Sequence, residues 1–173
     1  MKAIERRTSI LEYLNKKDAP LSASALAELL GVSRQIIVGD IALLRASGEV
    51  IIATPRGYVL EKSDPERSGV VRQIVCSHSA EAMEHELQLC IDYGCEVLDV
   101  IVEHPVYGQL IGQLHLRSRY DIAIFMDKVK NSDAHALSEL TDGIHIHTLL
   151  CPDEEIFRKL KEALAGEGIL VEE

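Results

Sequence analysis

Residues 20–60 read PLSASALAELLGVSRQIIVGDIALLRASGEVIIATPRGYVL, and this stretch decides the fold of the N-terminal part. It predicts two helices, each preceded by a serine whose hydroxyl can accept from the free backbone amides of the first helical turn. Ser22 caps the first helix, over 23–30, and Ser33 caps the second. Gly31 between them suits the left-handed geometry of a helix end. Two short helices joined by such a turn are typical of a helix-turn-helix.

The flanking residues complete a larger unit. Ile4, Leu11 and Leu14 follow helical spacing and predict a helix ahead of the pair. After Gly48, the segments 49–54 and 58–60 surround a Pro-Arg-Gly turn and predict a β-hairpin. Three helices followed by a hairpin indicate a winged helix.

The second helix of the motif has a face suited to reading DNA. Its apolar stripe consists of Ile37, Ile41 and Leu44, so the opposite face is free for the major groove. There, Gln35 suits adenine, Arg34 suits guanine or a phosphate, and Val38 suits a thymine methyl group. A solvated helix face is the alternative. The complete set of expected DNA contacts is Ser33, Arg34, Gln35, Val38 and, at the hairpin turn, Arg56.

Charge is distributed unevenly along the 173 residues, whose formal net charge is −10. Residues 1–62 contain nine Lys/Arg and seven Asp/Glu, whereas residues 63–173 contain nine and twenty-one, so the two parts carry +2 and −12. This asymmetry predicts a winged-helix DNA-binding domain over 1–62 and an acidic regulatory domain over 69–173, joined by the polar segment 61–68. Because the first domain is only mildly basic, tight DNA binding should need two copies.

Composition disfavours several other classes. No apolar run approaches the ~20 residues that cross a bilayer, and the charged N-terminus lacks the apolar segment of a signal peptide, so we expect a cytoplasmic protein without a membrane partner. The cysteines, Cys76, Cys90, Cys95 and Cys151, form no CxxC pair and are expected to be buried free thiols. No glycine-rich phosphate loop is present, which disfavours a nucleotide-hydrolysing enzyme.

The second domain alternates strands and helices. Strands are predicted over 69–76, 96–102, 109–116 and 143–150, with an edge strand over 169–171, and helices over 80–93, 119–130 and 152–165. The turn at 104–108 joins two consecutive strands, which favours a largely antiparallel sheet. The expected fold class is therefore α+β: a winged helix-turn-helix followed by a two-layer α/β sandwich.

Histidines supply a candidate metal site. His145 and His147 alternate with isoleucines on one predicted strand, so both imidazoles point to the same face. His78 ends an earlier strand, and Glu86 lies at the margin of a buried helical stripe, where a carboxylate needs a partner. Three imidazoles and a carboxylate suit Zn²⁺, Ni²⁺, Co²⁺ or Fe²⁺, with Cys76 as a reserve ligand. A solvated sheet face explains the His145–His147 pair equally well.

Longer motifs carry a resemblance. GVSRQ at 31–35, continuing through DIALLR at 40–45, resembles the winged helices of bacterial repressors related to the biotin-operon and deoxyribose families. His78, EHPVYG at 103–108 and LTDGIHIHT at 140–148 resemble the motifs of a three-histidine regulatory domain. Over nearly its whole length, the chain is similar to the niacin-responsive transcriptional repressors of NAD biosynthesis.

The resemblance implies a homodimeric repressor of NAD biosynthesis and niacin uptake genes, not an enzyme, with nicotinic acid as co-repressor. It implies an HPr-like second domain and a divalent transition metal, nickel and zinc among the candidates. The metal ligands it implies are His78, Glu86, His145 and His147.

The position of the effector is open to several interpretations. We expect the effector-binding residues to be His104, Tyr107 and Arg119. A turn-stabilising His104 and a salt bridge from Arg119 to Asp121 or a neighbouring acid fit the same residues, and His85, His115 and His135 are expected at the surface. A repressor in which the metal itself is the signal is the main alternative function. A small metallohydrolase, with Glu86 or Glu103 as base, would leave the winged helix unexplained.

Overall fold

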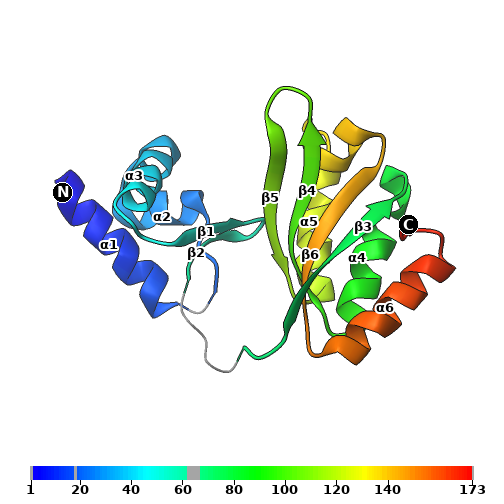
Figure 1. Cartoon of the computed structure of the whole chain (residues 1–173). Coiled ribbons are helices and arrows are strands. Elements are labelled where there is room, and N and C mark those ends of the chain that lie inside the picture. The colour runs from blue at the N-terminus through cyan, green and yellow to red at the C-terminus, as the bar shows by residue number, and fades with distance from the viewer. Residues whose placement is uncertain (1, 18, 62–66, 173) are drawn as a thin grey trace. The chain divides into compact units, whose positions relative to one another are not determined.

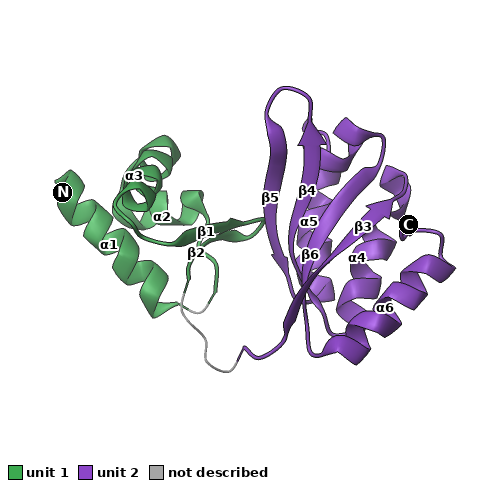
Figure 2. Ribbon diagram, viewed as in Figure 1, with its two compact units in different colours: residues 1–64 green, residues 65–173 purple. Residues whose placement is uncertain are grey.

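A computed structural model describes residues 2–17, 19–61 and 67–172. The chain divides into two compact units, residues 1–64 and 65–173 (Figure 2). The polar segment predicted as a linker, 61–68, lies for the most part outside the described residues. Within the described ranges, no helix combines the length and the apolar composition that crossing a membrane requires.

The first unit is the predicted winged helix. Its elements are α1 (Ala3–Lys16), α2 (Ala23–Leu30), α3 (Arg34–Ala46), β1 (Ile51–Thr54) and β2 (Gly57–Leu60), drawn in blue to cyan in Figure 1. Both predicted caps are present, because the Ser22 hydroxyl accepts from the Ala25 amide at 3.1 Å and the Ser33 hydroxyl accepts from the Ile36 amide at 3.4 Å. Gly31 ends α2 at φ 65°, as its left-handed geometry required.

One buried cluster holds these helices together. It includes Ile10, Leu14, Leu26 and the predicted stripe of α3, Ile37, Ile41 and Leu44. Beside it, the buried Asp40 of α3 accepts from Arg6 of α1, with Arg6 Nε 2.5 Å from Oδ2. This ion pair fixes α3 against α1 at the helix expected to read DNA.

The second unit is a two-layer sandwich. Its sheet has the strand order β3-β6-β4-β5 with every neighbouring pair antiparallel, and α4, α5 and α6 cover one face of that sheet (Figure 1). The strands are β3 (Val70–Ser77), β4 (Glu96–His104), β5 (Gly108–Leu116) and β6 (Ile144–Cys151), and the helices are α4 (Met83–Asp92), α5 (Arg119–Asn131) and α6 (Glu154–Gly166). All four cysteines are buried and free, as predicted.

Three local features differ from the sequence-based expectation. The segment 169–171 does not form a regular edge strand but an isolated bridge from Leu170 to Cys76 of β3. The helix expected over 80–93 begins as a 3-10 turn, Ala80–Ala82, before α4. A short 3-10 helix, Leu137–Thr141, leads into β6 and was not predicted, because its five residues are too few to show a helical period.

Candidate functional site

The four expected metal ligands meet in the second unit. His78 directly follows β3, Glu86 lies on α4, and His145 and His147 lie on β6. The antiparallel register pairs Cys76 with His145 and Ile74 with His147, so β3 and β6 present these side chains on the face that α4 covers. The exposed fractions of the four side chains are only 5% for His78, 0% for Glu86, 3% for His145 and 4% for His147.

Glu86 is the centre of this cluster. One carboxylate oxygen contacts His78 Nε2, both oxygens lie 3.2 Å from His145 Nε2, and His147 Nε2 lies 3.6 Å from Oε1. The prediction that Glu86 sits at the margin of a buried stripe was wrong, because its side chain is fully buried. The helical period placed Glu86 near the core, where a carboxylate needs a partner. The period could not show that β3 and β6 pass over Glu86.

A backbone carbonyl fixes the orientation of each imidazole. His78 Nδ1 lies 2.8 Å from the Ser79 oxygen, His145 Nδ1 lies 2.9 Å from the Gly143 oxygen, and His147 Nδ1 lies 2.7 Å from the Asp99 oxygen. A carbonyl oxygen only accepts, so each Nδ1 carries the hydrogen. Each Nε2 therefore aims at Glu86, and without a proton its lone pair would face the carboxylate oxygens. Protons or a cation must lie between these groups.

The electrostatics of the cluster agree with this requirement. Burial favours the neutral form of Glu86, but hydrogen bonds from the imidazoles outweigh it and hold the pKa of Glu86 below its ordinary value. Burial lowers the pKa of His78 and His147, yet the facing carboxylate raises both above the ordinary histidine value. Three Nε2 atoms around an ionised carboxylate form a donor set that fits a divalent transition metal.

The turn before β6 positions two of these histidines, and sequence reasoning did not assign it a role. Asp142 and Gly143 both have positive φ, 53° and 91°. The Gly143 carbonyl accepts from the His78 amide at 3.4 Å and from the His145 ring at 2.9 Å. A Cβ on Gly143 would lie 2.3 Å from the His78 carbonyl oxygen, so only glycine fits. The Asp-Gly dipeptide was the available signal.

Cys76, the expected reserve ligand, also borders the cluster. Its Sγ, a carboxylate oxygen of Glu86 and a ring nitrogen of His145 all lie within 4.8 Å of one another. The thiol is completely buried, and burial followed by the nearby carboxylate raises the pKa of Cys76.

Of the expected effector residues, His104 and Tyr107 lie together, whereas Arg119 lies elsewhere. His104 Nδ1 accepts from the Val106 and Tyr107 amides at 3.2 and 3.3 Å, so the turn-stabilising interpretation of His104 holds. The Tyr107 ring lies 5.1 Å from the His104 ring and the residue is 74% exposed. The turn that contains His104 and Tyr107 lies at the start of β5, whereas Arg119 lies after its end. A nine-residue strand spans roughly 25–30 Å, so Arg119 is far from that turn. Arg119 pairs with Asp92, with Nε 2.9 Å from Oδ1, so the salt-bridge interpretation of Arg119 holds.

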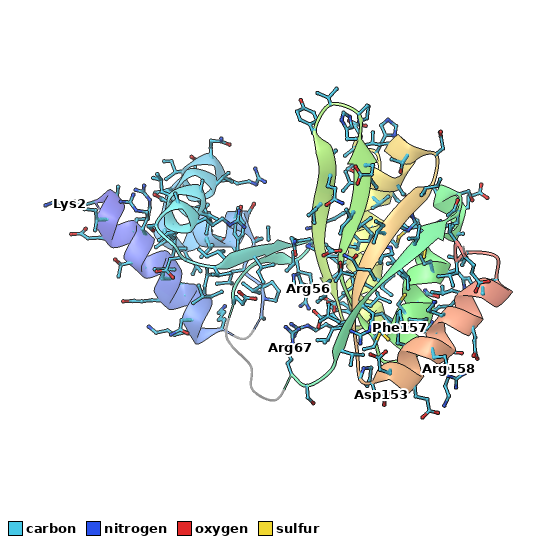
Figure 3. All side chains as sticks on the ribbon, viewed as in Figure 1. Lys2, Arg56, Arg67, Asp153, Phe157 and Arg158 are labelled. Carbon is cyan, nitrogen blue, oxygen red and sulfur yellow. The ribbon has the colours of Figure 1, made fainter. Side chains whose placement is uncertain are left out.

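Most of the expected DNA contacts lie on the surface of the first unit. Arg34 and Gln35 are exposed in the first turn of α3, and Figure 3 shows Arg56 at the turn between β1 and β2. Val38 differs, because it is partly buried and packs against the core of the unit. Ser33 serves as the cap of α3.

The remaining histidines are not part of the cluster. His85 and His135 are exposed and lie beside Glu167 and Glu139, at 3.4 and 2.9 Å, as expected for surface residues. His115 was expected at the sheet surface but is mostly buried, with Nδ1 3.3 Å from a Glu96 oxygen.

Known proteins share both units. Residues 6–59 match the family model of an HTH domain, and residues 71–173 match that of the 3H domain. The chain is 41% identical over 169 residues to the transcription repressor NadR of Bacillus subtilis, covering 97% of this chain and 94% of the relative. It is also 41% identical over 169 residues to the probable transcription repressor NiaR of Thermotoga maritima, covering 98% and 95%.

Proposed function

This chain belongs to the 3H-domain family of transcription repressors, and we propose that it is a homodimeric, DNA-binding repressor of NAD biosynthesis and niacin uptake genes. Its second unit holds a divalent transition metal, and nicotinic acid acts as co-repressor. Both relatives are named as transcription repressors, which favours a regulatory protein over an enzyme.

One observation carries the metal and effector proposal: three imidazoles converge by Nε2 on one fully buried carboxylate. A divalent metal bound there would offer a coordination position to the carboxylate or pyridine nitrogen of nicotinic acid. The chain's own residues hold the imidazoles in one tautomer, through the carbonyls of Ser79, Gly143 and Asp99. Little reorganisation is then needed when a metal binds.

The homodimer is supported by the sheet face opposite the helices. Side chains alternate along a strand. Because Ile74 and Cys76 of β3 are buried on the face that the helices cover, the odd-numbered residues of β3 point to the open face. It carries Val71, 53% exposed, and Ile144, also 53% exposed. Exposed aliphatic side chains on a sheet of an acidic domain favour burial against a second copy. Light scattering of the purified protein tests this, and a monomer at micromolar concentration would contradict it.

DNA binding and its control are tested together. A duplex selected from a random library by the metal-loaded protein is titrated by fluorescence anisotropy, with and without nicotinic acid. We expect nicotinic acid, and not nicotinamide, to tighten binding. No change with nicotinic acid would contradict the co-repressor. If the metal alone altered affinity and nicotinic acid added nothing, the metal itself would be the signal.

Two variants separate the roles of the units. Replacing both His145 and His147 by alanine should abolish the effect of nicotinic acid while basal DNA binding persists. Replacing Arg34 and Gln35 by alanine should abolish DNA binding while metal content is unchanged. His135, 81% exposed and outside the cluster, provides the matched histidine control.

A further inference from the structure

We infer that the Cys76 thiolate is an additional ligand of the metal in this chain, which turns the three-histidine, one-carboxylate site into a sulfur-containing one. The inference rests on the proposed metal site. It assigns to this chain a thiolate–metal bond and with it a preference for borderline-soft cations such as Zn²⁺ and Co²⁺ over hard ones.

Position is the first support. Cys76 lies directly opposite His145 in the β3–β6 register and two residues before His78. Its Sγ lies within 4.8 Å of both a Glu86 oxygen and a His145 ring nitrogen. Two ligand atoms of one tetrahedral zinc ion, with bonds of about 2.1 and 2.3 Å, lie roughly 3.6 Å apart. The three atoms would therefore have to approach one another by at most about 1.2 Å to share an ion.

Charge is the second support. Three neutral imidazoles, one carboxylate and a divalent cation leave a net charge of +1 in a site whose side chains are at most 5% exposed. A bare buried charge is costly. When Cys76 binds, its S–H bond breaks, a sulfur–metal bond forms, and the proton passes to the solvent. The thiolate brings the net charge to zero.

Cobalt provides the test, because a Co²⁺–thiolate bond adds an intense near-ultraviolet charge-transfer band to the weaker visible bands of the ion. The full-length protein is stripped of metal and titrated with CoCl₂ without added thiols. We expect both band types in the unaltered protein. Cys76→Ser and Cys76→Ala should keep the visible bands and lose the near-ultraviolet band, and Cys76→Ser should weaken zinc binding at least about tenfold.

Cys90→Ala is the matched control. Cys90 is equally buried and lies one helical turn after Glu86, yet its thiol is not among the clustered ligand atoms. The near-ultraviolet band should survive this change, and far-ultraviolet circular dichroism confirms that each variant is folded. Two results would overturn the assignment of Cys76 while leaving the metal site intact. One is visible bands without a near-ultraviolet band in the unaltered protein, and the other is a near-ultraviolet band that survives Cys76→Ala. Absence of any protein-bound cobalt spectrum would overturn the metal site itself.

Discussion

Replacing Gly39 by alanine should stabilise the protein and weaken its binding to DNA. Gly39 lies in the middle of α3, is exposed, and has no positive φ. A Cβ built there meets no atom within 4 Å. Alanine is favoured over glycine inside a helix by about 1 kcal/mol. For a unit of this size, that gain raises the melting temperature by roughly 4–8 °C.

The effect on DNA binding has the opposite sign. Gly39 lies between Gln35 and Ala42 on the exposed face of α3. If this face enters the major groove, a methyl group there meets the DNA instead of open space. Overpacking a fitted interface costs about 1–3 kcal/mol, which is roughly 5- to 150-fold in the dissociation constant.

Calorimetry of the free protein and fluorescence anisotropy with the selected duplex measure the two effects. Gly166→Ala is the matched control, because Gly166 ends α6 and its Cβ also meets nothing within 4 Å. It should leave DNA affinity unchanged. A Gly39→Ala protein that binds DNA as tightly as the unaltered one would refute the placement of this face in the groove. A lower melting temperature of Gly39→Ala would refute the conclusion that a Cβ at position 39 meets no other atom in the free protein.

Three further results are expected. Gly143→Ala should unfold the turn or displace a ligand, since its Cβ would lie 2.3 Å from a backbone oxygen, and zinc titration should show a loss of at least about tenfold in affinity. Asp40→Asn should lower the free energy of unfolding in urea by about 2 kcal/mol, because it leaves the Arg6 guanidinium without its carboxylate; an unchanged value would contradict this. Zinc affinity should fall as the pH drops, beginning above the ordinary histidine pKa, because zinc displaces protons from His78 and His147, whose pKa values are raised. Calorimetry in two buffers counts the released protons, and a flat affinity between pH 8 and pH 6 would count against the raised values.

The winged helix could be predicted because its determinants are local. A serine cap, a left-handed glycine and a helical stripe each act within a few residues, and Ser22, Ser33 and Gly31 all have the predicted geometry. The antiparallel sheet followed in the same way from one short turn. Val38 shows the limit of such reasoning, because its contact with the core depends on how α3 packs and not on its spacing.

The histidine cluster could be predicted only in part. Alternation placed His145 and His147 on one face, but the complete burial of Glu86 required α4 to cross that face. A salt bridge of Arg119 was predicted, but Asp92 could not be named as its partner for the same reason, since Asp92 is distant in the sequence and is brought near by packing. Periodicity predicts which side of an element is buried, whereas packing decides what it meets.

The anchoring of His147 has a consequence for regulation. Its Nδ1 hydrogen bonds to the Asp99 carbonyl of β4, beside the irregularity between Val97 and Asp99, so a ligand that draws Nε2 toward Glu86 also pulls on β4. At the start of β4, Glu96 accepts from Arg67 at 2.6 Å. Strand β4 therefore contacts both the histidine cluster, through the Asp99 carbonyl, and Arg67, which precedes β3. Under the proposed function, a shift of His147 when the site is occupied would be passed along β4 as far as Arg67.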